Sequence, residues 1–107
     1  MDWSKKLKAL AEENRLKILA LLEQEDLCVR SLAHRLDYSE ASISQHLKIL
    51  REAGLVRGEK RGYFVHYTVC EEELINTAEA LKQLAEKIEV PKECKKSHEG
   101  DCCRKNN

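Results

Sequence analysis

The chain has 107 residues, of which 42% are hydrophobic and 36% are charged. This length suits a single domain with a short tail, and no stretch approaches the roughly 18 consecutive apolar residues of a membrane span. The first residues lack the long apolar region of a secretory signal, so we expect a cytoplasmic protein with no membrane partner. The net charge is zero, although Lys and Arg outnumber Asp and Glu by seven to four over residues 30–66. That local excess is compatible with contact to nucleic-acid phosphates.

Two predicted helices precede the centre of the chain. Residues 3–12 predict the first helix, and the second begins near Asn14 and contains the strongly apolar run 16–22. The polar residues 24–26 predict a loop. Residues 27–29 follow as a short apolar link into the next helix.

Residues 29–36 and 39–53 predict two short helices that meet at a tight turn. In the second helix, Ile43, Leu47 and Leu50 step by four and then three residues, which defines one apolar helix face. The same helix carries hydrogen-bonding side chains away from that face. A helix pair of this kind places its second helix in the DNA major groove, so the sequence predicts DNA binding. The side chains that we expect to contact DNA from this helix are Ser42, Ser44, Gln45, His46 and Lys48.

Residues at both ends of the second helix support its bounds. Ser39 is a good N-cap because its hydroxyl can accept a hydrogen bond from the unpaired amides of the first turn. Gly54 closes the helix because glycine readily adopts the left-handed conformation that a C-cap requires.

Residues 55–69 change to a pattern typical of strands. Residues 57–62 are polar and contain two glycines, and the run 63–69 is dense in aromatic and β-branched residues. This pattern predicts a β-hairpin directly after the DNA-reading helix, which is the wing of a winged helix. We expect Lys60 and Arg61, at the hairpin tip, to meet phosphates or the minor groove.

Residues 71–88 predict a final helix with an acidic first turn. Its apolar residues repeat at intervals of four and three, which predicts a seam for a partner helix. The seam residues are Leu74, Ala78, Leu81, Ala85 and Ile88. Since the first helix offers a second apolar surface, we expect a homodimer that forms through the first and last helices.

Pro91 ends the helical region. We therefore divide the chain into a DNA-binding and dimerisation domain at 1–90 and a flexible, Cys-rich tail at 91–107. Three of the five cysteines are in the tail. An odd number of cysteines in a reducing compartment argues against a framework of structural disulfides and favours metal binding or thiol redox chemistry.

With these residues in view, the chain resembles the ArsR/SmtB family of metal- and stress-responsive transcriptional repressors. The matching segments, in the family's order and spacing, are NRLKILALL, EDLCVRSLAHRL, SEASISQHLKILREAGLV and RGEKRGYFVHYTV. The resemblance implies a dimeric winged helix-turn-helix protein, mainly α with a β-hairpin wing, that binds double-stranded operator DNA. It also implies that an inducer lowers the affinity for the operator, with no obligatory cofactor.

Two inducer sites that the family uses are incomplete in this chain. Arsenic-responsive relatives carry cysteines at the positions of Cys28 and Arg30, so only one thiol of that pair remains. The zinc site of other members needs histidine on the last helix, and residues 71–88 contain none. The tail supplies three thiols, as in relatives with arsenic-binding cysteines near the C-terminus, and they belong to Cys94, Cys102 and Cys103. Thiolates suit arsenite and other thiophilic metal(loid)s, so we expect these three to bind the inducer, with Cys28 as a further candidate ligand.

Two other functions remain open. A redox-sensing repressor would form a disulfide between Cys28, whose place near a helix start favours the thiolate, and Cys102 or Cys103. A thiol-rich metal-buffering or protein-interaction module would no longer contact DNA, but Gln45 is suited to pairing with adenine. An enzyme is disfavoured because the chain has no CxxC motif, no Gly-rich phosphate loop and no supported nucleophile–base pair.

Overall fold

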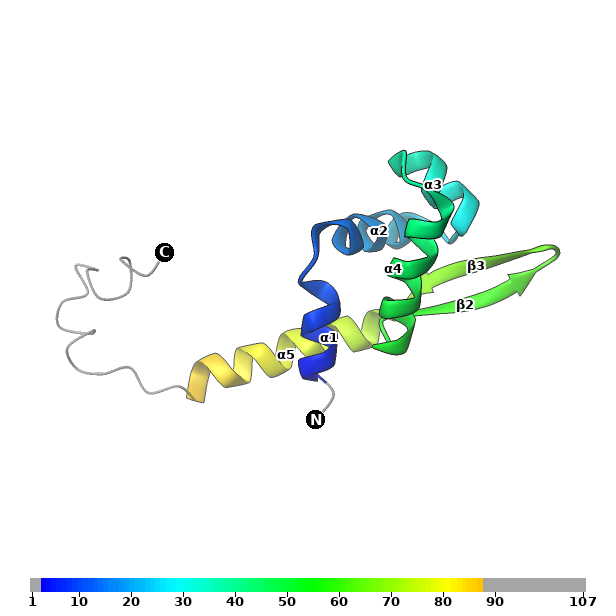
Figure 1. Cartoon of the computed structure of the whole chain (residues 1–107). Coiled ribbons are helices and arrows are strands. Elements are labelled where there is room, and N and C mark those ends of the chain that lie inside the picture. The colour runs from blue at the N-terminus through cyan, green and yellow to red at the C-terminus, as the bar shows by residue number, and fades with distance from the viewer. Residues whose placement is uncertain (1–2, 88–107) are drawn as a thin grey trace.

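The computed structural model describes residues 3–87, which form five helices and one three-stranded antiparallel sheet. In chain order the elements are α1 (Trp3–Leu10), α2 (Glu13–Gln24), β1 (Leu27–Cys28), α3 (Val29–Leu36), α4 (Glu40–Glu52), β2 (Val56–Arg61), β3 (Phe64–Val69) and α5 (Glu71–Lys87). The α5 helix extends toward one end of the molecule, and the β2–β3 hairpin projects at the other (Figure 1). This architecture confirms the predicted mainly α fold with a β-hairpin wing. The predicted tail, 91–107, lies outside the described residues, and no helix within them is long and apolar enough to cross a membrane.

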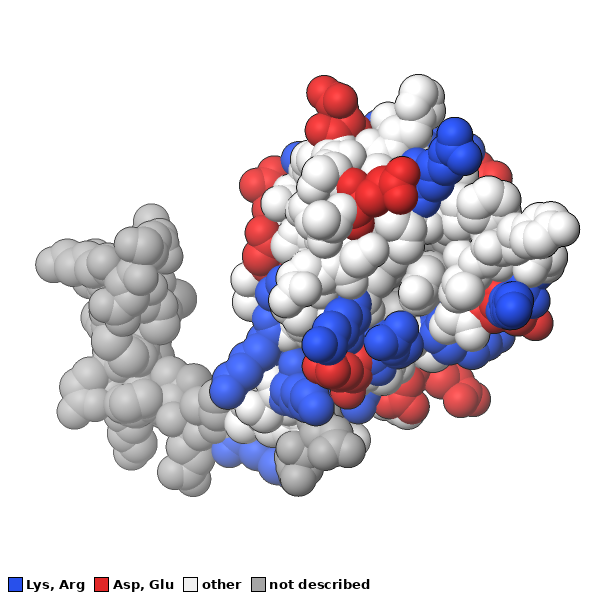
Figure 2. Space-filling view, turned by 45° about the vertical axis from the view of Figure 1, so that its right-hand side comes forward, with Lys and Arg blue, Asp and Glu red and all other residues white. Residues whose placement is uncertain are grey.

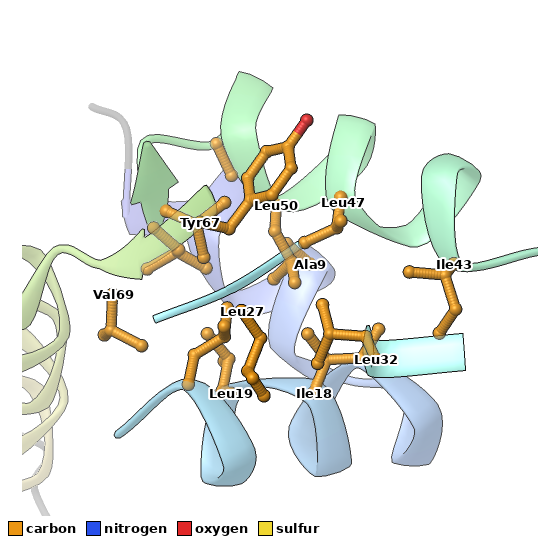
Figure 3. Packing of buried hydrophobic residues seen from close by; sticks show 14 of the residues in the cluster. Ala9, Ile18, Leu19, Leu27, Leu32, Ile43, Leu47, Leu50, Tyr67 and Val69 are labelled. Carbon is orange, nitrogen blue, oxygen red and sulfur yellow. The ribbon is translucent and has the colours of Figure 1, made fainter. Parts of the chain in front are cut away.

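The apolar face of α4 lies at the centre of the hydrophobic core. Ile43, Leu47 and Leu50 are each at most 1% exposed. They belong to one cluster with buried side chains of α2, α3 and β3, shown in Figure 3. Full burial of a Leu or Ile side chain contributes about 2 kcal/mol. Three such residues on one face therefore fix how α4 is rotated about its axis, and they turn its opposite face to solvent.

Local hydrogen bonds set the turn between α3 and α4. Ser39 Oγ accepts a hydrogen bond from a backbone amide in the first turn of α4 at 3.0 Å, which confirms the predicted N-cap. Gly54 follows the helix with a φ of +81°, the left-handed conformation predicted for it. Inside the turn, Asp37 has a φ of +59°, and the Tyr38 hydroxyl donates a hydrogen bond to Asn14 Oδ1 on α2. The turn is thus fixed to α2 as well as to its own two helices.

The segment predicted as an apolar link, 27–29, is instead a short strand followed directly by α3. In β1, Leu27 pairs with Tyr67 and Cys28 pairs with His66 of β3. The prediction was wrong because two residues are too few to show the alternation by which a strand is recognised. The pairing makes β3 the middle strand, in the order β1–β3–β2, and it joins the base of the wing to the start of α3.

Gly58 in β2 lies directly against two side chains of β3. A Cβ atom at this position would be 2.9 Å from Val65 Cγ1 and 3.3 Å from Tyr67 Cε2. Tyr67 is buried in the core, so its ring has little room to move away. Glycine therefore allows β2 to run close to β3 along the wing.

We predict that Gly58→Ala lowers the free energy of unfolding by about 1–3 kcal/mol because the added methyl group overpacks the wing. Urea unfolding at a fixed protein concentration measures the change. Lys60→Ala, at an exposed position of the same strand, is the matched control and should change stability by less than about 0.5 kcal/mol. Replacing glycine with alanine also restricts the unfolded chain, which alone would raise stability. A gain in stability for Gly58→Ala would therefore contradict the close approach of β2 to the side chains of β3.

Candidate nucleic-acid interface and thiol site

The outer face of α4 carries three of the predicted DNA-binding residues. Ser44, Gln45 and Lys48 are exposed and lie opposite the buried apolar face. Together they present a hydroxyl, a primary amide and an ammonium group on a helix that is about 20 Å long. These groups can hydrogen-bond to base edges and to phosphate oxygens.

The other two predicted residues of α4, Ser42 and His46, lie on its flank and are half-buried. His46 Nδ1 lies 3.4 Å from Arg15 Nη1 on α2. Arg15 also donates hydrogen bonds from Nε to the carbonyl of Ala9 at 2.6 Å and from Nη2 to the carbonyl of Lys8 at 3.5 Å. One guanidinium group therefore links α1, α2 and α4, and it holds His46 against the body of the protein.

The two predicted residues of the wing have different environments. Lys60 is exposed. Arg61 Nη2 lies 2.7 Å from Asp26 Oδ2 and 2.7 Å from Glu59 Oε1. The hydrogen bond from Arg61 is the main reason that the pKa of the Asp26 carboxyl lies below its ordinary value. Arg61 is thus bound to carboxylates of its own chain, and its contact joins β2 to the residue before β1.

Two exposed arginines, Arg51 in the last turn of α4 and Arg57 in β2, were missing from the set of predicted DNA-binding residues. Arg51 and Arg57 line an open groove of about 930 Å³ together with Lys5, and residues 71–73 of α5 place three glutamates on the same groove. Figure 2 shows Lys and Arg side chains gathered in a band across one face, with carboxylates among them. The basic excess over residues 30–66 was the signal for these arginines, but charge counting does not say which side chains share a surface.

Cys28 is buried at the N-cap of α3, with its Sγ 3.4 Å from Ser31 Oγ. Burial alone would raise the pKa of the Cys28 thiol. The hydrogen bond between Cys28 and the Ser31 hydroxyl, together with the backbone amides of Ser31 and Arg30, outweighs burial, so the pKa of the thiol is lowered. A lowered pKa agrees with the thiolate character expected for a cysteine at a helix start. Cys28 also lines an open groove of about 510 Å³ with Arg30 and Phe64.

The other predicted inducer ligands, Cys94, Cys102 and Cys103, lie outside the described residues. Within residues 3–87, no three His, Cys, Asp or Glu side chains are close enough together to hold a metal ion. Cys70, the second cysteine of the described part, is half-buried between β3 and α5. The described part of the chain therefore offers single thiols and no assembled metal centre.

Comparison with known proteins assigns the family. The family model described as bacterial regulatory protein, arsR family, matches residues 12–57. Transcriptional activator HlyU of Vibrio cholerae is 42% identical over 78 residues, which are 73% of this chain and 72% of HlyU. The arsenical resistance operon repressor of Bacillus subtilis is 32% identical over 105 residues, which are 94% of this chain and 90% of that protein. The chain belongs to the arsR family.

A further relative of this ArsR-family chain is the cadmium resistance transcriptional regulatory protein CadC of Listeria innocua. It is 40% identical over 73 residues, which are 67% of this chain but only 61% of the relative. The three relatives are transcriptional regulators rather than enzymes, and their names include an activator, a repressor and two kinds of metal resistance. The chain is therefore a DNA-binding transcriptional regulator of a family with metal-responsive members.

Solved structures agree with this assignment. An ArsR-like transcriptional regulator from a Rhodococcus species has a TM-score of 0.74 at 34% identity, covering 78% of this chain and 79% of the other. Reduced HlyU from Vibrio cholerae has a TM-score of 0.64 at 39% identity, covering 78% and 87%. A homodimeric winged helix-turn-helix DNA-binding domain from Mycobacterium bovis has a TM-score of 0.67 at 28% identity, covering 82% of each chain. The winged helix-turn-helix fold predicted from the sequence is thereby confirmed.

We predict that Ser31→Ala raises the pKa of Cys28 because it removes the side-chain hydrogen bond that stabilises the thiolate. A lowered pKa means that more thiolate is present at neutral pH, so the variant should need a higher pH for the same alkylation rate. The pH dependence of alkylation by iodoacetamide measures this shift in a background with Cys70, Cys94, Cys102 and Cys103 replaced by Ser. Ser44→Ala, a serine on the outer face of α4, is the control. Equal titration midpoints for Ser31→Ala and the control would refute the role of Ser31.

Proposed function

We propose that this ArsR-family chain is a cytoplasmic repressor that binds operator DNA as a homodimer and is released by a thiophilic metalloid such as arsenite. The observation that carries the proposal is the solvent-facing surface of α4 next to a projecting wing. Ser44, Gln45 and Lys48 are among the exposed residues of α4, away from its buried apolar face. A helix of this kind fits the major groove, which distinguishes all four base pairs.

In this proposal the predicted DNA-binding residues have separate roles. Gln45 and Ser44 contact base edges, and Lys48 and Lys60 contact phosphates. Ser42 and His46, on the flank of α4, meet the DNA backbone at the edge of the groove. We assign no phosphate contact to Arg61, because two carboxylates already hold its guanidinium group. Two arginines outside the seven predicted residues, Arg51 in the last turn of α4 and Arg57 in β2, add exposed positive charge.

A homodimer through α1 and α5 would cover apolar surface that the single chain exposes. Ile75, Leu81 and Leu84 on α5 are 59%, 41% and 44% exposed. Leu81 and Leu84 are three residues apart and so lie on one side of the helix, and exposed apolar surface of this kind is typical of a protein–protein interface. Two-fold symmetry would also place two copies of α4 on successive major grooves of one DNA face, as in other helix-turn-helix dimers.

Thiol chemistry supports the proposed inducer. Arsenite is held best by three thiolates, and the tail contains three cysteines within ten residues, at Cys94, Cys102 and Cys103. The folded domain adds Cys28, whose pKa is lowered and which lies directly before α3 of the helix pair. Binding that involves Cys28 would act on the base of the wing, because β1 pairs with β3.

We predict that the reduced protein binds a duplex from upstream of its own gene more tightly than competitor DNA. Gln45→Ala should cost about 1–3 kcal/mol and relax sequence preference, whereas Lys48→Ala should weaken binding to all sequences and lower the salt slope by about 1. Fluorescence anisotropy at several salt concentrations measures both effects. Glu23→Ala, an exposed residue on α2, is the control. Unchanged affinity in both α4 variants would overturn the proposed interface.

We predict that arsenite releases the wild-type protein from this duplex and fails to release a variant with Cys94, Cys102 and Cys103 replaced by Ser. The substitutions remove the proposed ligands and leave the DNA-binding surface intact, so the affinity without arsenite should not change. The same anisotropy assay measures the affinity without arsenite and the release of each protein by arsenite. Release of the triple variant at wild-type arsenite concentrations would exclude the tail as the inducer site. Cys70→Ser is the matched control, because Cys70 lies within the folded domain.

A second candidate function is a thiol redox switch. The lowered pKa of Cys28 favours it, because the thiolate is the form that attacks a disulfide or an oxidant. In this case an oxidant would release DNA, dithiothreitol would restore binding, and arsenite would have no effect. Treating the same protein–DNA complex with arsenite and then with an oxidant therefore distinguishes the two candidate functions.

A further inference from the structure

A single guanidinium group connects α4 to the two helices that precede the helix pair. Arg15, in the first turn of α2, donates a hydrogen bond from Nε to the carbonyl of Ala9 at 2.6 Å and from Nη2 to the carbonyl of Lys8 at 3.5 Å. Both carbonyls belong to the last turn of α1, where a helix leaves its carbonyl oxygens without partners. The remaining nitrogen, Nη1, lies 3.4 Å from His46 Nδ1 on α4. Each nitrogen of the guanidinium group therefore has a contact of its own.

The contact with Arg15 determines which ring nitrogen of His46 carries the hydrogen. A guanidinium group has five N–H donors and no acceptor, so the nitrogen that it contacts has to accept. A neutral imidazole has one donor nitrogen and one acceptor nitrogen. Since Nδ1 accepts from Arg15, the ring hydrogen is on Nε2, and Nε2 is a donor.

The donor nitrogen of His46 is turned away from the body of the protein. The ring is half-buried, and because Nδ1 faces α2, Nε2 lies on the side of the ring away from α2. Within residues 3–87, the one buried side-chain nitrogen or oxygen without a hydrogen-bond partner is His66 Nδ1. His46 Nε2 has no hydrogen-bond partner in the same residues, so it is not buried but accessible to solvent.

A second hydrogen-bonding group lies one helical turn away on the same flank of α4. Ser42 precedes His46 by four residues, which is the spacing at which side chains are neighbours on a helix surface. Both residues are half-buried, between the apolar face and the exposed outer face of the helix. When α4 lies in a major groove, such a flank faces the DNA backbone, whose phosphate oxygens accept hydrogen bonds from neutral as well as charged donors.

We propose that Arg15 is a positioning residue for DNA binding, which holds the His46 ring so that Nε2 donates a hydrogen bond to a DNA phosphate. The proposal rests on the proposed function, because it requires that α4 occupies the major groove. Lysine cannot replace Arg15 in this role, because a single ammonium group lacks the planar fork that reaches α1 and His46 at once. Arg15 itself makes no contact with DNA, so it acts only through the ring that it holds.

The test uses Arg15→Lys, which keeps the positive charge and changes the geometry of the donors. The affinity for a duplex from upstream of the protein's own gene should fall about fivefold, because the His46 ring is no longer held. The slope of log affinity against log salt should not change, since a neutral ring displaces no counterion. Fluorescence anisotropy at several salt concentrations measures both. Lys17→Arg, a charge-preserving exchange at an exposed position of the same helix, is the matched control and should bind like the wild type.

A double-mutant cycle separates positioning from a general effect on the fold. His46→Ala should lower the affinity about tenfold, because the donor is absent. Arg15→Lys in the His46→Ala background should then cost less than about twofold, since no ring remains to be held. A purely structural role of Arg15 would lower the affinity by the same factor in both backgrounds. Urea unfolding gives the folded fraction of each variant, by which the affinities are corrected.

The tautomer of His46 is measured on the wild-type protein, so this result does not depend on how any variant folds. Long-range ¹H–¹⁵N correlation spectra at about pH 8, where histidine is ordinarily neutral, distinguish a ring nitrogen that carries hydrogen from one that does not. The signals of His46 are those that His46→Ala lacks. We expect the hydrogen on Nε2.

Three results would overturn the positioning role. Hydrogen on Nδ1 of His46 would do so, because Nδ1 could then not accept from Arg15. Wild-type affinity of Arg15→Lys, or equal losses in both backgrounds of the cycle, would do so as well, and weakened binding of Gln45→Ala or Lys48→Ala would then leave the proposed function intact. If Gln45→Ala and Lys48→Ala bind like the wild type, the α4 interface fails and the role of Arg15 fails with it.

Discussion

The burial of one face of α4 is the constraint on which the functional surface depends. Ile43, Leu47 and Leu50 are almost fully removed from solvent, so rotation of α4 by even one residue position would expose a core side chain. A helix turns by about 100° per residue. The outward direction of Gln45 and Lys48 is consequently fixed by residues that never meet a ligand. The core determines which side chains are presented, and those side chains determine what can be bound.

The wing is attached to the domain through two different kinds of contact. Backbone pairing of β1 with β3 joins its base to the start of α3, and the ion pair between Arg61 and Asp26 joins its outer strand to the same region. An isolated two-stranded hairpin is marginally stable in water. These attachments give the wing a defined direction relative to α4. They also make the segment around Cys28 a structural neighbour of the wing, so a chemical change at that thiol would act where the hairpin is anchored.

Sequence reasoning was most accurate where local chemistry determines structure. The bounds of α3 agree with the prediction, and Ser39 and Gly54 have the capping roles expected of them, because caps depend on side chains within a few residues. The strand β1 was missed because it owes its existence to β3, about forty residues later. The ion pair of Arg61 with Asp26 was missed because its two residues are also far apart in the sequence.

In the candidate site, too, features set by neighbouring residues were predicted and features set by distant residues were missed. Helical spacing placed Gln45 opposite the apolar face of α4, where the structure exposes it. Spacing alone could not show that His46 is in contact with Arg15, because that contact depends on how α2 packs against α4. The predicted thiol ligands at 91–107 lie outside the described residues.

The contact between Arg15 and His46 has a consequence for how recognition can evolve. Adaptation to a new DNA sequence requires changes in side chains that meet the bases while the fold is retained. Gln45 and Lys48 can vary at little structural cost, since both are exposed. A change at His46 would also remove a neighbour of the guanidinium group that binds the end of α1. Under the proposed interface, new specificities should arise first on the outer face of α4, because His46 also contacts Arg15 of α2.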